Sequence, residues 1–226
     1  GGVAVVSGYN GEADDDNVNV EFYPSLGLER PLSGIGPDGG FIPIGAVVPP
    51  RFDPSDRWMR DTAYRLPFTS DGTQITDASA YVVGGKLVAR FPVFAMAITV
   101  PDNVQRLDIR LQDAVIVGDV VGTDTDGGAK TWSLANAVIG GRWAAREILS
   151  VVRPLYISRT NTHVCDDPEG VYKLVKSTMC VARDIALTGN GSPDVQCDAL
   201  SAGLRAETYT VDGYGRWVDR VDAGNP

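Results

Sequence analysis

A two-glycine turn between two apolar segments constrains the fold of this chain more than any other feature. Residues 80–83 read Ala-Tyr-Val-Val, Gly84-Gly85 follows, and residues 86–100 form a long partner segment rich in Val, Phe and Ile. Paired glycines between such segments are typical of a two-residue β-hairpin, because both turn positions need positive φ. Pro92 has no N–H to donate, which predicts a bulge or an edge position in the second strand.

Alternating side chains predict further strands on both sides of this hairpin. In residues 104–111, Leu107, Ile109 and Leu111 alternate with Asp108 and Arg110, so the apolar set is expected to face inward. The same criterion predicts strands over residues 18–23, 132–139 and 204–211, and residues 114–121 extend or follow the strand of residues 104–111.

Two helices are expected after the strands. The first spans about residues 142–152, and the second spans about 168–187, with Asp167 as N-cap and Pro168 at the first helical position. The predicted buried stripe of the second helix consists of Val171, Leu174, Val175, Thr178, Ala182 and Ile185.

Together these elements predict a mainly β fold, with a β-sandwich or jelly-roll-like core and two helices in the C-terminal third. Residues 1–226 are expected to form a single domain. Its β core spans about residues 17–140, and a helical, disulfide-bearing part of about residues 141–226 packs on that core.

The charge balance limits the partners of the chain. It has 20 basic and 29 acidic residues, for a formal net charge of −9. Such a field repels phosphate backbones, so nucleic acid is not an expected partner, whereas divalent cations, basic proteins or solubility alone all fit. No run of about 18 apolar residues is present, so no transmembrane segment is predicted.

Catalytic motifs are missing from the sequence. The one histidine, His163, has no G-x-S-x-G elbow or H-E-x-x-H motif to work with, and there is no Walker A loop or dinucleotide fingerprint. These absences favour a protein that is not an enzyme.

Three cysteines, Cys165, Cys180 and Cys197, favour one disulfide and an oxidising compartment. In a helix that starts at Pro168, Cys180 lies roughly 18 Å along the axis. The steps from Cys165 to Pro168 span at most about 10.5 Å, and a disulfide needs Cα atoms within about 7 Å. The predicted bridge is therefore Cys180–Cys197. A zinc site formed by the cysteines and His163 is the alternative.

Acidic clusters at two places suggest that the protein binds either no cofactor or calcium. One includes Asp14 and Asp16, and the other includes Asp124 and Asp126 in a Gly-Thr-Asp-Thr-Asp-Gly-Gly segment. Calcium prefers oxygen ligands at alternate positions of a flexible loop. An ordinary Asp/Gly turn without metal explains the same pattern.

Two tryptophans in polar surroundings, Trp58 and Trp217, are candidates for ligand contact, for example by stacking on a sugar. Partial burial is the competing explanation for both of them.

A set of C-terminal motifs resembles the tail of uncharacterised bacterial secreted lipoprotein-like proteins. The resemblance implies an exported envelope or extracellular protein and carries over no catalytic residue. Its motifs are Cys165-Asp166-Asp167-Pro168, Val175-Lys176, Cys180, Arg183-Asp184-Ile185 and Cys197-Asp198-Ala199-Leu200-Ser201.

The leading functional hypothesis is a non-enzymatic, secreted or cell-surface structural or adhesive module. Its expected partner is a second copy of itself or another surface component, because edge strands suit repeating contacts. The alternatives are a secreted polysaccharide hydrolase that uses two carboxylates and a calcium-dependent carbohydrate-binding module.

Overall fold

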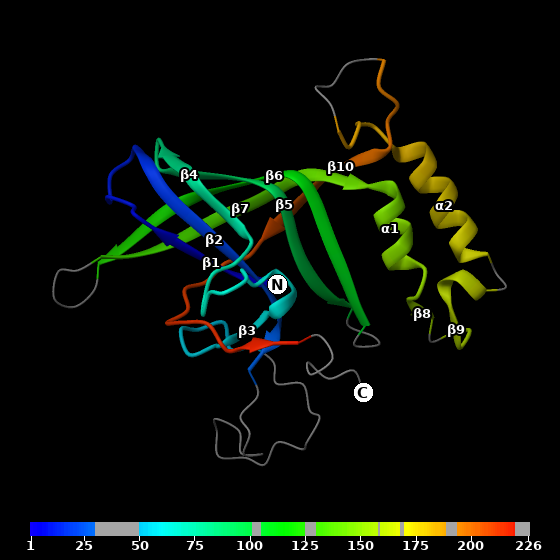
Figure 1. Ribbon diagram of the computed structural model, residues 1–226, viewed down its shortest axis with the longest axis horizontal. Coiled ribbons are helices and arrows are strands. Elements are labelled where there is room, and N and C mark those ends of the chain that lie inside the picture. Colours follow the sequence, from blue (N-terminus) through cyan, green and yellow to red (C-terminus); the bar gives the residue numbers. More distant parts are fainter. Residues whose placement is uncertain are drawn as a thin grey trace, which may run out of the picture.

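The computed structural model describes residues 1–29, 50–100, 105–124, 130–157, 159–167, 170–188 and 194–219. Within these ranges the protein is mainly β with two helices in its C-terminal half, which confirms the predicted fold class (Figure 1). The strands are β1 (Gly2–Ser7), β2 (Asp15–Leu28), β3 (Trp58–Asp61), β4 (Ile75–Val83), β5 (Lys86–Val100), β6 (Gln105–Asp124), β7 (Lys130–Ala144), β8 (Tyr156–Ile157), β9 (Thr162–His163), β10 (Ala199–Ala206) and β11 (Trp217–Val218). The helices are α1 (Ala145–Val152) and α2 (Val171–Ala182), with 3-10 turns η1 (Thr62–Tyr64) and η3 (Val164–Asp166).

One large sheet contains most of the described strands. Its order is β10-β7-β6-β5-β4-β2-β3-β11, and β1 pairs with β2. All neighbours are antiparallel except β11, which runs parallel to β3. The short strands β8 and β9 form a separate hairpin.

The β4–β5 hairpin is the turn that the sequence predicts. Gly84 has φ of 55° and Gly85 has φ of 73°, so both positions adopt the conformation that only glycine takes without strain. The two strands pair only from Val83↔Lys86 to Tyr81↔Val88. Beyond that point they separate, which divides the sheet into two parts that meet at the hairpin.

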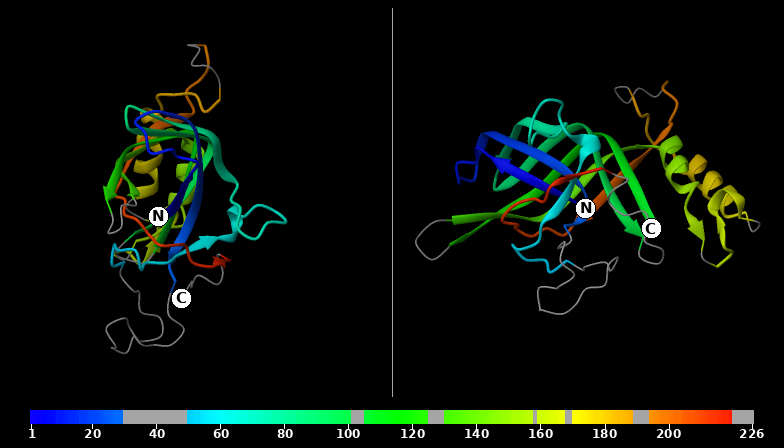
Figure 2. Two further views of the ribbon diagram at one scale, coloured as in Figure 1. Left: turned by 90° about the vertical axis from the view of Figure 1, so that its left-hand side faces the viewer. Right: turned by 60° about the horizontal axis from the view of Figure 1, so that its bottom comes forward.

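The core lies between these two parts, and this gives it a sandwich-like organisation. Figure 1 shows β1 and β2 crossing β6 and β7 at a steep angle, and Figure 2 shows the same crossing from below. Phe22 on β2 and Phe94 on β5 meet across it, with ring centroids 4.4 Å apart. Most of the buried set follows the two-residue period of the strands, and the period shifts within β4, near Pro92 and at Asp113. The set is Val18, Val20, Phe22, Ile75, Ala80, Val82, Leu87, Ala89, Phe91, Phe94, Ala95, Ile109, Leu111, Ala114, Ile116 and Ile139.

Pro92 lies on the open edge of β5. Two residues earlier, the Arg90 N–H points away from β6 and donates to Asp77 on β4. Successive backbone N–H groups point to opposite edges of a strand, so residues 90 and 92 share one edge. The missing N–H of Pro92 therefore lies on the side away from β6 and costs no β5–β6 bond. The prediction of an edge position is therefore correct.

The long strands β6 and β7 bend at a bulge. The register shifts between Gln112↔Arg142 and Val115↔Gly140, and Asp113 takes a φ of 48°. Gly141 faces the bulge, where a Cβ would lie 2.9 Å from that of Leu111 and 3.3 Å from the Cα of Ala114. Glycine is therefore required at this position by close backbone approach.

The C-terminal elements differ in extent from the prediction. Residues 142–144 belong to β7 rather than to α1, and α2 begins at Val171 and ends at Ala182. The predicted N-cap is wrong: Gly170 takes that position, and from just before it Asp167 Oδ2 accepts a hydrogen bond from the N–H of Val171 at 3.1 Å. Pro168 lies outside the described residues. The last long strand, β10, spans 199–206 rather than 204–211 because it is set by pairing with β7.

Residues 145–188, here called the helical lobe, project from one end of the sheet (Figure 1). No helix in the described ranges has the length and apolar character needed to cross a membrane.

Candidate functional site

The predicted calcium ligands near the N-terminus instead stabilise a turn. Asp14 Oδ1 accepts a hydrogen bond from the N–H of Gly84 at 2.8 Å. Buried Asp15 accepts from the N–H groups of Asn10 and Asn17, while Asp16 is exposed. No three His, Cys, Asp or Glu side chains in the described residues gather as a metal site, so calcium there is not supported.

The second predicted calcium site is only partly visible. Asp124 is the last residue of β6, and Asp126 lies outside the described residues. The zinc alternative is likewise without support, since His163 and the three cysteines form no metal-holding group in the part of the chain that the structure describes.

The predicted Cys180–Cys197 disulfide is wrong for this structure, in which Cys165, Cys180 and Cys197 are all free thiols. The prediction assumed that the chain after the second helix returns along its last turns. Instead, Ile185 bridges to Ala199 at the start of β10, so the chain runs to the sheet. Cys180 stays exposed on the solvent side of α2.

Trp58 and Trp217 are both half-buried. The Trp58 indole N–H donates to the hydroxyl of Tyr209 at 2.6 Å, and that hydroxyl donates to Asp56 Oδ2 at 2.9 Å. The Trp217 indole N–H donates to the carbonyl of Ser70 at 3.0 Å. Both indole donors therefore serve contacts within the protein, and a role in ligand contact stays a prediction.

Trp217 belongs to a cluster around buried Arg60. The guanidinium carbon lies 3.9 Å from the ring centre of Tyr214 and 4.5 Å from that of Trp217, and Nε donates to the carbonyl of Gly215. Such cation–π contacts are strong when desolvated. The cluster fixes the segment around β11 on β3, and sequence reasoning missed it because its members are far apart in the chain.

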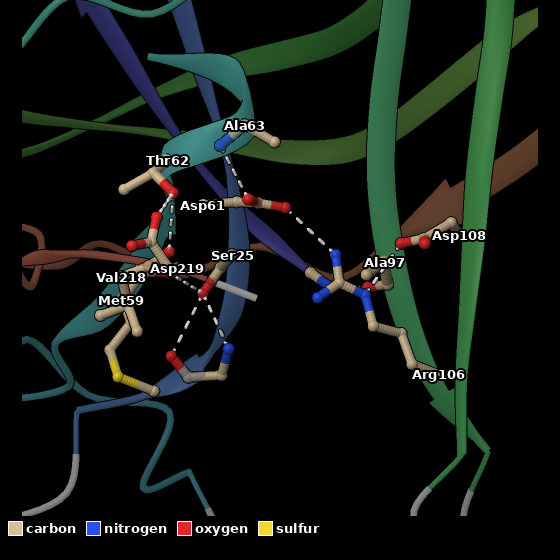
Figure 3. A network of polar contacts seen from close by, with 12 residues as sticks. Ser25, Met59, Asp61, Thr62, Ala63, Ala97, Arg106, Asp108, Val218 and Asp219 are labelled. Carbon is tan, nitrogen blue, oxygen red and sulfur yellow. Dashed lines mark hydrogen bonds and ion pairs between the residues drawn. The ribbon is translucent and has the colours of Figure 1, made fainter. Parts of the chain in front are cut away.

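A polar network lies beside this cluster, where β3 meets the end of β5 (Figure 3). Asp61 has no exposed surface, and its Oδ2 lies 3.2 Å from Nη2 of Arg106, while Oδ1 accepts from the N–H of Ala63. Arg106 also pairs with Asp108 at 2.8 Å and lines a cavity of about 70 Å³ with Ser25 and Trp58. The cavity has room for water-sized molecules, so this network fits a structural role.

A wider groove of about 570 Å³ opens where β4 and β5 separate. Its acidic lining residues are Asp77 and Asp113. Asp77 accepts hydrogen bonds from Ser79 and from the Arg90 N–H, and Asp113 lies 3.7 Å from Arg142. Both carboxylates are thus engaged within the protein.

Among the helices and strands that the structure describes, α2 in the helical lobe carries the most exposed large apolar side chains. Leu174 is 67% exposed and Val181 is 86% exposed. The two side chains lie on the same side of α2, about two helical turns apart. Leu174 and Val181 are here called the helical face. No residue of α2 is buried.

The stripe predicted for this helix is therefore wrong in part. Its half-buried residues are Val171, Tyr172, Val175 and Met179, whereas Leu174, Thr178 and Ala182 are exposed. The reason is that, among the described elements, α2 packs mainly against α1 and η3, which cover one side of it.

A second surface gathers acidic side chains at the tip of the β4–β5 hairpin. Asp15 pairs with Val82 and both point inward, so their neighbours Asp14, Asp16 and Val83 point outward. Val83 is 54% exposed, and Glu12 lies in the adjoining loop. Glu12, Asp14, Asp16 and Val83 are here called the acidic tip.

Charge is distributed unevenly between the lobe and the rest of the chain. Residues 145–188 include six basic and five acidic residues, and the rest of the chain includes 14 basic and 24 acidic residues. The formal net charge of the helical lobe is therefore +1, and that of the rest of the chain is −10.

Comparison with known proteins adds no functional information, since no family model, curated protein or solved structure matches the chain.

Proposed function

We propose that this protein is a non-enzymatic structural or adhesive module that associates with copies of itself outside the cell. The observation that carries the proposal is the exposed state of α2. Helices of about 12 residues are marginal in water on their own and depend on packing of an apolar face. α2 has 12 residues and none is buried, so a second surface that covers Leu174 and Val181 would stabilise it.

Two open strand edges are protected against association, which favours the helix as the contact surface. On β5, Asp77 occupies the Arg90 N–H and Pro92 supplies no donor. On β10, Asp184 Oδ1 accepts from the N–H of Ser201 at 2.7 Å, so this carboxylate occupies part of the outer edge. Carboxylates and proline on edges are common means of preventing strand pairing.

The extracellular location rests on the resemblance of the C-terminal motifs around Cys165, Cys180 and Cys197 to secreted lipoprotein-like proteins. Protease treatment of intact cells that express the full natural protein tests this part. Digestion without lysis is expected. Protection until the cells are lysed would contradict it.

Sedimentation velocity between about 1 and 100 µM tests self-association. The wild-type protein should sediment faster as its concentration rises. The variant Leu174→Ser/Val181→Ser should remain monomeric, because it removes exposed apolar surface without touching the core. A wild-type protein that is monomeric over the whole range would refute the proposed function.

A further inference from the structure

One loop presents an aromatic side chain that gains no burial from the fold of a single copy. Residues 65–73, here called the Phe68 loop, lie between η1 and β4. Phe68 is fully exposed, and Leu66 in the same loop is exposed as well. Phe68 also has a φ of 63°, a strained conformation that bulky side chains rarely adopt. Strain of this kind clusters at functional sites, which makes the loop a candidate contact surface.

Hydrogen bonds hold the Phe68 loop in this conformation. Arg65 Nε and Nη2 donate to the carbonyl of Thr69 at 3.0 and 2.8 Å, and the Thr69 hydroxyl donates to the carbonyl of Leu66 at 3.1 Å. The Leu66 N–H donates to the carbonyl of Gly72 at 2.9 Å, which closes the base of the loop. A surface that is fixed in this way loses little conformational freedom on binding.

The Phe68 loop and α2 lie apart within one copy. In the left view of Figure 2, the loop, in cyan, projects to the right of the rest of the molecule, whereas α2, in yellow, lies to the left. The loop is therefore free to reach a surface on another molecule.

The helical face has a shape that accepts one aromatic ring. Leu174 and Val181 are seven residues apart, which is about 10.5 Å along the helix axis. The small, exposed residues Ser177 and Thr178 lie on the turn between them, and the Ser177 hydroxyl donates back to the carbonyl of Leu174 at 2.9 Å. A ring centred in this gap would lie about 5 Å along the axis from each aliphatic side chain, so its carbons reach both.

Net charge favours this unlike pair of surfaces over a pair of like ones. The helical face belongs to the helical lobe, whose formal net charge is +1, and the Phe68 loop belongs to the rest of the chain, whose net charge is −10. Two lobes repel each other, and so do two of the acidic parts. The lobe of one copy and the acidic part of another attract each other, which steers the two copies toward this orientation.

We propose that Phe68 of one copy inserts between Leu174 and Val181 of a second copy, so that molecules associate head to tail. This inference rests on the proposed function and names the surface that covers the helical face. A phenylalanine buries about 150–250 Å², and stable interfaces bury roughly 1,200–2,000 Å² in total. The contact is therefore weak and reversible, and it can repeat along an open chain because the two surfaces differ.

Variants of Phe68 test the contact in sedimentation velocity. Phe68→Ser should weaken self-association at least about 10-fold, because aromatic anchors carry much of the binding free energy of an interface. Phe68→Gly should weaken it equally. Glycine takes a φ of 63° without strain, so the urea midpoint of this second variant should be no lower than that of wild type.

The decisive measurement is the equimolar mixture of Phe68→Ser with Leu174→Ser/Val181→Ser. The first variant keeps an intact helical face, and the second keeps an intact Phe68 loop. One contact can form between them, and each pair then leaves only altered surfaces free. The mixture should therefore form dimers and no larger species, although each variant alone is monomeric at the same concentration.

Phe52→Ser is the matched control. Phe52 is also exposed and has a positive φ of 59°, but it lies outside the Phe68 loop. This variant should associate like wild type.

Three results would overturn the Phe68 contact and leave the proposed function standing. They are normal association of the Phe68 variants, loss of association in Phe52→Ser, and a mixture that stays monomeric while wild type associates. Monomeric wild type would refute the proposed function as well.

Discussion

The Asp77 carboxylate accepts the backbone N–H of Arg90 at 2.7 Å across the point where β4 and β5 cease to pair. A side chain thus replaces the strand partner that the backbone would otherwise have. The same carboxylate accepts from the N–H and hydroxyl of Ser79, so it closes the open side of the sheet. Asp77 is itself buried, which makes these bonds worth more than exposed ones.

Replacing Asp77 by alanine should therefore lower the free energy of unfolding by about 2 kcal/mol, since a backbone donor loses its partner. It should also increase aggregation on heating, because the β5 edge becomes available. Urea titration and light scattering measure the two effects. Asp124→Ala, at the end of β6, is the control and should change neither.

Gly141→Ala should destabilise the protein by about 2 kcal/mol, because the new methyl would overlap Leu111 and the backbone of Ala114. Gly203 on neighbouring β10 has no atom within 4 Å of an added Cβ. Gly203→Ala should thus leave the urea midpoint nearly unchanged. Equal effects of the two substitutions would show that close approach does not explain Gly141.

Arg106→Met should cost about 3 kcal/mol in urea titrations, because the buried carboxylate of Asp61 loses its ion pair with Arg106. Adding Asp61→Asn to this variant should recover part of the loss, since the buried charge is removed. A double variant as unstable as the sum of both single variants would show that the two residues are not coupled.

Alkaline pH should destabilise the protein through Tyr209. Burial, and then the hydrogen bond to Asp56, raise the pKa of Tyr209 to about 12. The unfolded tyrosine has a pKa near 10, so between pH of about 10 and 12 only the unfolded state ionises. The contribution of Tyr209 to the free energy of unfolding is therefore fully present below a pH of about 10, and it is lost as the pH rises through about 12.

Burial and the nearby Glu21 also raise the pKa of Tyr23, which adds to the same loss. Tyr209→Phe should flatten the dependence of the urea midpoint on pH in this range. An unchanged slope would show that Tyr209 does not contribute to it.

Free thiols should be detectable without reduction. Titration with a thiol reagent in denaturant should find three thiols per chain, and a reducing agent should leave the melting temperature unchanged, because Cys165, Cys180 and Cys197 are unpaired. One thiol per chain, with a link between Cys180 and Cys197 in peptide mapping, would restore the bridge that the sequence favoured.

Local rules predicted the parts of the fold that depend on neighbouring residues. Gly84-Gly85, the alternation through Leu107, Ile109 and Leu111, and the edge position of Pro92 all follow from backbone sterics and from the two-residue period of strands. Strand ends were less predictable. The sequence left open whether residues 114–121 continue the strand before them, and pairing with β5 and β7 makes β6 one strand.

The candidate site was harder to predict for a related reason. Helical periodicity identified α2 but placed Leu174 on its buried side, because periodicity finds an apolar face without showing what covers it. The exposed run at Asp14 and Asp16 was visible as acidic, yet its position beside Val83 depends on how β2 pairs with β4.

The sequence by itself determined that the chain is mainly β, where its central hairpin turns, and that its charge is strongly negative. Only the tertiary structure decided that the sheet opens between β4 and β5, that Arg60 and Arg106 are held among distant partners, and that α2 keeps an uncovered face. The physical reason is range: turns and alternation depend on adjacent residues, whereas burial and ion pairing depend on contacts between residues far apart in the chain.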